Sequence, residues 1–162
     1  DTGNTELIKD DILQLIKEYE VEVVDVSSLT PEDWTTHDFY ILGIPTWYDG
    51  DLQSDWEDYF PTFEEIDFTG KTVAIFGLGD QLGYEEWFCD GIGILSEVIL
   101  KNKGKIVGFT EKDESYDFET SKALKDDNTF YGLALDEDNQ PHISKERIRK
   151  WIEQLKSYLE NE

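Results

Sequence analysis

Short apolar runs alternate with amphipathic stretches along this chain. Residues 39–44 (FYILGI) and 72–78 (TVAIFGL) are continuous apolar runs bounded by polar residues. Such a run is typical of a parallel strand that is buried on both faces. Three shorter runs, at residues 21–26, 106–109 and 131–135, predict further strands.

Apolar residues at helical spacing fill the intervals between these runs. They predict helices over residues 7–16, over residues 91–100 and at the end of the chain. We expect Ser144 to cap the last helix, with Ile143 and Ile148 forming a hydrophobic staple around that cap. The alternation of strands and helices predicts an α/β fold with a parallel sheet.

The length of 162 residues predicts a single domain over residues 1–162. No apolar run approaches the roughly 18 residues that cross a bilayer, so no membrane span is expected. The one cysteine, Cys89, excludes an internal disulfide, and the protein is therefore expected to be cytoplasmic.

The charge of the chain is strongly negative, because 38 Asp and Glu stand against 14 Lys and Arg, giving −24. This field should repel nucleic acid and anionic membranes and attract a basic protein partner. Solubility alone is the alternative explanation for such a composition.

The first segment with candidate chemistry is DTGNTE at residues 1–6, directly before the first predicted helix. Hydroxyl-bearing residues and glycine at a helix start can bind a phosphate, since free N–H groups and the helix dipole favour an anion there. The same residues also make an ordinary helix cap. No Lys or Arg precedes Lys9, so any phosphate would be held by neutral donors.

Two further segments directly follow predicted strands, where ligands bind in parallel sheets. Residues 44–50 (IPTWYDG) carry Trp47, and residues 77–90 (GLGDQLGYEEWFCD) carry Tyr84 among several glycines. A phosphate cradle together with two aromatic rings fits a phosphorylated planar cofactor held between the rings. The alternative for Trp47 is a ring folded back onto the domain.

The segments IPTWYDGDLQSDW, FGLGDQLGYEEWFCDGIG and FYGLALDEDNQ together resemble the long-chain flavodoxin family, over essentially the whole chain. The resemblance implies an FMN cofactor and a flavodoxin-like three-layer α/β sandwich with a parallel sheet of strand order 2-1-3-4-5. The polar stretch at residues 111–128 corresponds to the insertion in the last strand that defines the long-chain group.

The resemblance also assigns cofactor contacts to residues of this sequence. They are Thr2, Gly3, Asn4 and Thr5 in the phosphate loop; Thr46 near the phosphate or ribityl chain; Trp47 and Tyr84 on the inner and outer flavin faces; Tyr48, Asp49 and Gly50 beside the flavin N5; Leu78, Gly79 and Asp80 at the pyrimidine end; and Cys89 and Asp90 near the ribityl chain. Trp87 stands where many members of the family have Asn.

The family's first strand, which forms the centre of the sheet, has no counterpart ahead of Asp1 in this sequence. The sequence also contains no methionine. We therefore expect that residues ahead of Asp1 have been removed and that the first strand is missing from this chain.

The function implied by the resemblance is low-potential one-electron transfer by bound FMN, between a reductase and reductive enzymes, rather than stand-alone catalysis. The implied partners are basic redox proteins such as a flavodoxin or ferredoxin-NADP reductase. A monomer is expected, with no nucleic-acid or membrane partner.

Several alternatives remain open at this point. An FMN-dependent NAD(P)H:quinone reductase is the main one, and an acidic binding module without a cofactor is another. A response-regulator-like domain would need an Asp at the end of the strand that begins near residue 39, and residues 41–45 contain none. His37 and His142, the only histidines, lie in different predicted loops and indicate no metal site.

Overall fold

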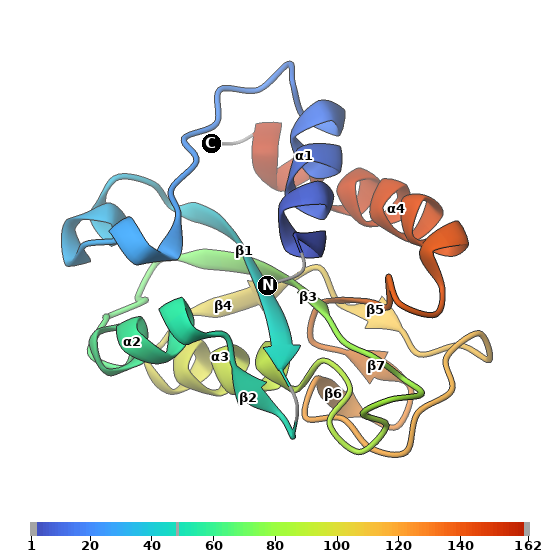
Figure 1. Cartoon of the computed structure of the whole chain (residues 1–162). Coiled ribbons are helices and arrows are strands. Elements are labelled where there is room, and N and C mark those ends of the chain that lie inside the picture. The colour runs from blue at the N-terminus through green and yellow to red at the C-terminus, as the bar shows by residue number, and fades with distance from the viewer. Residues whose placement is uncertain (1–2, 48, 161–162) are drawn as a thin grey trace.

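The computed structural model describes residues 3–47 and 49–160, and Figure 1 shows helices packed around a central sheet. The helices are α1 (Asn4–Leu15), α2 (Ser54–Phe63), α3 (Asp90–Lys101) and α4 (Pro141–Glu160), with short 3-10 helices η1 (Val26–Ser28) and η2 (Pro31–Thr35). None of the described helices is long and apolar enough to cross a membrane.

The main sheet is mostly parallel and has β3 (Thr72–Leu78) in its interior. β1 (Phe39–Trp47) runs parallel to β3 along one edge. β4 (Lys105–Val107) and β8 (Leu133–Leu135) share the other edge, pairing with residues 72–74 and 76–78 respectively. A short strand, β2 (Asp51–Leu52), pairs antiparallel with the end of β1. β1, β3 and the pair of β4 and β8 therefore correspond to strands 3, 4 and 5 of the predicted order 2-1-3-4-5.

The two faces of the sheet carry separate hydrophobic cores, as expected of a three-layer sandwich. Alternate residues of a strand point to opposite faces. Ile75 of β3 accordingly packs with Phe63 of α2 and Ile92 of α3. Its neighbour Phe76 packs with Trp151 of α4 in the other core, which also takes in α1. The unbroken apolar run of β3 is thereby explained, because both of its faces are covered.

The polar stretch at residues 111–128 is not an open loop. With its flanking residues it forms a small antiparallel sheet of β5 (Thr110–Glu111), β7 (Thr129–Phe130) and β6 (Leu124–Asp126). Tyr116 and Phe118 from this stretch pack against Phe88 and Phe130. The guanidinium of Arg147 in α4 lies 3.9 Å from the Tyr116 ring centroid, which ties this stretch to the last helix.

The predicted strand at residues 21–26 is not formed. Residues 21–25 follow an irregular, exposed path, with Val23 52% exposed, and Val26 begins η1. A strand requires a neighbouring backbone to pair with, and no described strand pairs with this segment. The apolar composition of residues 21–26 is therefore not enough to make this segment a strand.

Two further features differ from the sequence-based expectations. The last helix begins at Pro141, so Ser144 lies inside its first turn and is not its cap. The Ser144 hydroxyl instead donates to the carbonyl of Gln140 at 3.3 Å. Proline suits the first turn of a helix, because the missing N–H has no partner there in any case. Helix α2 and strand β2 were not predicted.

Candidate functional site

A cavity of about 360 Å³ lies beyond the carboxyl ends of β1 and β3. This volume is within the roughly 300–1,000 Å³ typical of small-molecule pockets. Its walls come from the start of α1, the end of β1, the loop after β3 and the loop after β8. The lining residues are Asn4, Thr5, Pro45, Thr46, Trp47, Leu78, Gly79, Asp80, Tyr84, Glu137 and Asp138.

One end of the cavity is formed by the N-terminus of α1. Gly3 is the N-cap of this helix, with φ 85°, and Asn4 and Thr5 of its first turn line the cavity. A helix N-terminus presents N–H groups without intrahelical partners and favours negative charge. Among the described residues that line the cavity there is no Lys or Arg, and Lys9 is paired with Glu6 at 2.6 Å.

Two aromatic residues, one at the end of a strand and one in a loop, line the same cavity. Trp47 is the last residue of β1, and its backbone position is held by pairing with Asp51 of β2. Tyr84 lies in the loop after β3, where its N–H donates to the carbonyl of Asp80 at 3.0 Å. Rings placed on separate segments around one cavity can contact the faces of a flat ligand.

The carboxylate of Asp80 organises the loop after β3. Its Oδ1 accepts hydrogen bonds from the N–H of Gly83 at 2.7 Å and from the side chain of Asn139 at 2.8 Å. Burial acts to raise the pKa of Asp80, but the hydrogen bonds from Gly83, Asn139 and Leu82 together lower it. The side chain therefore remains ionised and is engaged within the protein.

Glycine is required at position 79 by a close approach of two backbones. A Cβ on Gly79 would lie 2.7 Å from the backbone nitrogen of Cys89. The loop after β3 is thus in direct contact with the start of α3. Cys89 itself is fully buried behind this wall and does not line the cavity, and burial raises the pKa of its thiol well above the usual range.

Asp49, Gly50 and Asp90 also lie outside the cavity lining. Asp49 is exposed, whereas Gly50, with φ 84°, sits where an added Cβ would lie 3.0 Å from Oδ2 of Asp90. Asp90 is 1% exposed, and its Oδ1 accepts from the N–H of Lys122 at 2.7 Å. Burial raises the pKa of Asp90, with the Lys122 hydrogen bond acting against this.

The end of β1 and the start of α3 are joined by a hydrogen bond from the N–H of Gly91 to Oγ1 of Thr46, at 2.9 Å. Asp90 and the turn at Gly50 therefore stand directly behind the Thr46–Trp47 wall. Trp87 lies beside the same turn, with Cδ1 3.0 Å from a Cβ built on Gly50. Thr2 and Tyr48, which were also predicted to contact the cofactor, lie outside the described residues.

Sequence analysis missed two acidic residues of the cavity, Glu137 and Asp138. They follow β8, whose carboxyl end lies at the same sheet edge as those of β1 and β3. Ligands bind beyond the carboxyl ends of parallel strands. Applying this rule to β8, as was done for the strands before residues 44–50 and 77–90, would have identified both residues. Partial desolvation of this largely exposed carboxyl, and then the negative charges of Asp80, Asp136 and Glu137, raise the pKa of Asp138.

Together these features define an α/β protein with a ligand crevice at the strand ends of a mostly parallel sheet, walled by two aromatic rings and closed by a helix N-terminus. The flavodoxin family model matches residues 1–151, and the chain belongs to the flavodoxin family.

Individual relatives extend this result. The chain is 48% identical to a flavodoxin of Klebsiella pneumoniae and 47% identical to flavodoxin 1 of Escherichia coli K12, each over 98% of this chain and 90% of the relative. A crystal structure of Fusobacterium nucleatum flavodoxin bound to flavin mononucleotide superposes with a TM-score of 0.91 at 36% identity, covering 98% of this chain and 93% of that one.

Proposed function

We propose that this protein binds FMN and carries single electrons between a reductase and reductive enzymes. The observation that carries the proposal is the cavity that joins two aromatic rings, Trp47 and Tyr84, to the N-terminus of α1. A flat ring system bearing a phosphate has the shape and charge that such a cavity accommodates. Membership of the flavodoxin family supports the same ligand.

The phosphate is assigned to the start of α1, with Thr2, Gly3, Asn4 and Thr5, and to Thr46. Neutral N–H and hydroxyl donors suit a phosphate when the helix dipole supplies the favourable potential. The absence of Lys and Arg among the lining residues is consistent with this assignment.

The flavin ring is assigned to the space between Trp47 and Tyr84, with its pyrimidine end against Leu78, Gly79 and Asp80. Because the Asp80 carboxylate is already engaged by Gly83 and Asn139, we assign the contact there to backbone groups.

The segment of Tyr48, Asp49 and Gly50 is assigned to the N5 edge of the flavin. Asp90 supports that segment from behind, through its approach to Gly50, and Cys89 supports the pyrimidine end through its backbone next to Gly79. Both residues are therefore proposed to position the site rather than to form its wall.

When bound, FMN supplies the one-electron chemistry. The chain's own contribution is to exclude water with its rings and to surround the flavin with negative charge. Glu137 and Asp138 line the cavity, and the net charge of the chain is −24. Negative charge placed near the flavin disfavours the addition of an electron, so a low midpoint potential is proposed.

The acidic surface supports basic redox partners such as a flavodoxin or ferredoxin-NADP reductase, met by electrostatic steering. We further propose a cytoplasmic monomer in which residues 1–162 form one long-chain flavodoxin-like domain, with no nucleic-acid partner. Acting alone, it would not oxidise NAD(P)H with a quinone, and steady turnover in that assay would favour a quinone reductase instead.

The direct test is a titration of the flavin-free protein with FMN, followed by quenching of flavin fluorescence. Saturable binding of one FMN per chain is expected. Riboflavin, which lacks the phosphate, serves as the matched ligand and should bind markedly more weakly. Equal affinity for the two ligands would contradict the assignment of the phosphate to α1, and no binding of either would reject the function.

A further inference from the structure

Gln81 is a buried polar side chain in the loop after β3, next to the candidate cofactor cavity. It is 2% exposed, whereas residues 82–86 of the same loop are exposed and Asp80 is half-buried. Gln81 does not line the cavity, but Asp80 and Tyr84, which flank it in sequence, do. A buried side chain between two lining residues is well placed to fix where they lie.

The amide of Gln81 has partners in two other segments of the chain. Its Nε2 donates to Oδ2 of Asp136 at 3.0 Å and to Oε1 of Gln140 at 2.9 Å, so both of its N–H groups are used. Its Oε1 accepts from the N–H of Asp117 at 2.6 Å. One side chain thus joins the loop after β3 to the loop after β8 and to the stretch at residues 111–128.

That stretch binds the loop a second time, just beyond Tyr84. The carbonyl of Glu85 accepts from the N–H groups of Glu119 and Thr120, at 2.8 and 3.0 Å. Tyr84 therefore lies between two positions, 81 and 85, at which its loop is bound to residues 117–120. A backbone that is fixed on both sides of a residue limits the directions in which the side chain can point.

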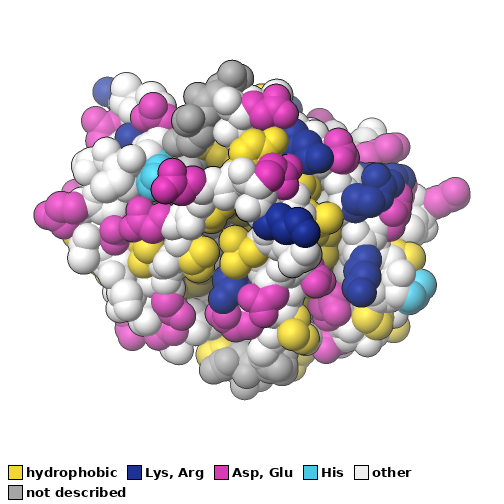
Figure 2. All heavy atoms as spheres, turned by 90° about the horizontal axis from the view of Figure 1, so that it is seen from above, with side chains coloured by type: hydrophobic (Ala, Val, Ile, Leu, Met, Phe, Trp, Pro, Cys, Tyr) yellow, Lys and Arg dark blue, Asp and Glu magenta, His cyan; other side chains and the backbone are white. Residues whose placement is uncertain are grey.

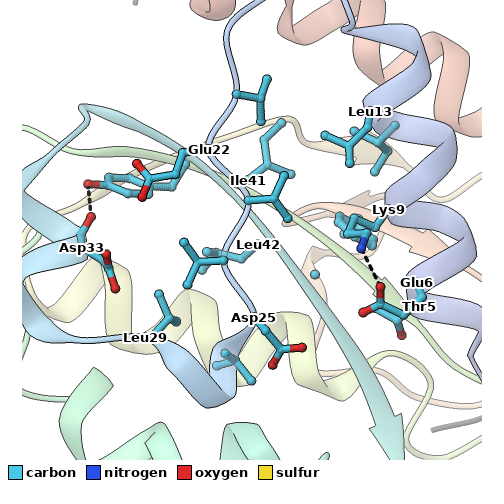
Figure 3. A pocket seen from close by; sticks show the side chains of 18 of the residues that line it. Thr5, Glu6, Lys9, Leu13, Glu22, Asp25, Leu29, Asp33, Ile41 and Leu42 are labelled. Carbon is cyan, nitrogen blue, oxygen red and sulfur yellow. Dashed lines mark hydrogen bonds and ion pairs between the residues drawn. The ribbon is translucent and has the colours of Figure 1, made fainter.

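An arginine holds the far side of this network. At the surface of this acidic chain, Lys and Arg side chains lie beside Asp and Glu, as the face in Figure 2 shows, and Lys9 with Glu6 in Figure 3 is one such pair. Arg147 instead donates to neutral acceptors, Oε1 of Gln140 at 2.9 Å and Oγ of Ser115 at 2.8 Å. Hydrogen bonds from a charged donor are stronger than those between neutral groups, so the partners of Gln81 are themselves held firmly.

We propose that Gln81 is a positioning residue for the cofactor, which fixes the Tyr84 ring at the cavity wall by joining its loop to residues 115–120 and to Asp136. This inference rests on the proposed function, in which the Tyr84 ring covers one face of the flavin. Because Gln81 does not line the cavity, its effect on FMN passes through the ring. Tyr84 should therefore contribute its full share of the affinity only while the amide of Gln81 is in place.

A double-mutant cycle in FMN affinity tests this dependence. Gln81→Met keeps an unbranched side chain of similar length without the hydrogen bonds, and should weaken FMN binding at least about fivefold, since buried partners lose their donors and acceptor. In that background Tyr84→Ala should cost no more than about threefold, against about tenfold or more in the parent. Trp47→Ala, at the other ring, should keep its full effect in the same background.

Gln81→Glu provides a readout that a loss of packing would not change. Its carboxylate can accept from the N–H of Asp117 but cannot donate to Asp136, whereas its protonated form can do both. Burial and the charges of Asp136 and Asp80 favour the protonated form, and Arg147, beyond Gln140, acts against it. Relative to the parent at each pH, FMN affinity of this variant should recover as the pH falls from about 8 to about 5.5. The variant also serves if Gln81→Met does not fold.

Hydrogen exchange of the full, flavin-free chain tests the network without FMN. The N–H of Asp117 loses its acceptor in Gln81→Met, and the N–H of Tyr84 lies in the loop that is released. Both should exchange at least about tenfold faster than in the parent, because local opening becomes easier.

Asn102→Leu is the matched control. The side-chain amide of Asn102 likewise joins two segments, because it donates to the carbonyls of Glu64 and Ile66 at 2.9 and 2.8 Å. It lies at the opposite end of α3 from the cavity. This variant should leave FMN affinity and the exchange of the Tyr84 N–H unchanged.

The outcomes separate this inference from the proposed function. Additive effects of Gln81→Met and Tyr84→Ala, no recovery of Gln81→Glu at low pH, or unchanged exchange at Tyr84 would overturn the positioning role. A parent chain that binds no FMN would reject the proposed function, while faster exchange at Tyr84 in Gln81→Met would still uphold Gln81 as the residue that fixes this loop.

Discussion

The side-chain amide of Asn139 donates to Oδ1 of Asp80 at 2.8 Å and to Oδ2 of Asp136 at 2.8 Å. It thus joins the loop after β8 to the loop after β3, although the two are far apart in sequence. Both loops line the candidate cofactor cavity, and this amide acts together with Gln81, whose N–H and side chain both donate to Oδ2 of Asp136 at 3.0 Å, in holding them together. Removing the Asn139 side chain leaves the carboxylates of Asp80 and Asp136 with fewer hydrogen-bond donors in a shared, partly buried network.

Asn139→Ala is expected to lower the free energy of unfolding by about 1–3 kcal/mol at pH 7, since hydrogen bonds to charged groups are lost. The pKa of Asp80 is lowered in the folded protein, so its contribution to stability is present above the ordinary value of 3.8 and is lost as the pH falls through the folded value. Urea unfolding at pH 7 and pH 3.5 should therefore give a smaller difference at pH 3.5. Asn128→Ala, at an exposed turn, is the control and should have little effect at either pH.

Asp90→Asn is expected to raise the free energy of unfolding at pH 7, whereas Asn139→Ala lowers it. Burial raises the pKa of Asp90, so the folded state binds this proton more tightly and its stabilising effect is lost as the pH rises through the raised value. The neutral variant does not undergo this loss. Its free energy of unfolding at pH 7 should exceed that of the parent by at least about 0.5 kcal/mol, which is more than exposed substitutions usually produce. Denaturant unfolding between pH 4 and 8 measures it, with Asp127→Asn as the exposed control. If the free energies of unfolding of variant and parent differ by the same amount at every pH, the difference does not come from the titration of Asp90.

Loss of either aromatic wall should weaken FMN binding. Trp47→Ala and Tyr84→Ala are each expected to reduce affinity about tenfold to a hundredfold, because stacking a flat base on an aromatic side chain is worth about 1–3 kcal/mol. Fluorescence titration with FMN measures the change. Trp47→Phe and Tyr84→Phe keep a ring at each position and should recover most of the affinity. If the Phe variants bind as weakly as the Ala variants, the rings do not act by stacking.

The carboxylate of Asp138 should lower the midpoint potential of bound flavin. Asp138→Asn removes one negative charge from the cavity and is expected to raise the potential by roughly 20–60 mV, where 59 mV corresponds to a tenfold change for one electron. The shift should shrink at high salt, because this side chain is exposed. Spectroelectrochemical titration measures it, and Asp138→Glu, which keeps the charge, should stay close to the parent. A similar shift in both variants would point to altered packing.

Much of the fold could be predicted because its signals are local. The run at residues 72–78 coincides with β3, and the run at residues 39–44 lies within β1. The stripe beginning at residue 7 lies on α1, and the stretch at residues 91–100 lies within α3. In each case a single face or run of apolar residues must be buried, and its period determines the element.

The site was predictable to the extent that it follows strand ends. Trp47 and Tyr84 were singled out by position and Thr46 by the family resemblance, and all three line one cavity. Glu137 and Asp138 were missed, although they follow a strand of the same sheet. Cys89 and Asp90, which the resemblance assigns to the ribityl chain, are buried and do not line this cavity, and their contact with the cofactor stays a prediction.

The sequence by itself determined which segments must be buried and which residues stand at the strand ends. Only the tertiary structure decided that residues 21–25 form no strand, that residues 110–130 form a small separate sheet, and that Asn139 links Asp80 to Asp136. The physical reason is that periodicity reports burial along one element, whereas strand pairing and hydrogen-bond networks require partners that are distant in the chain.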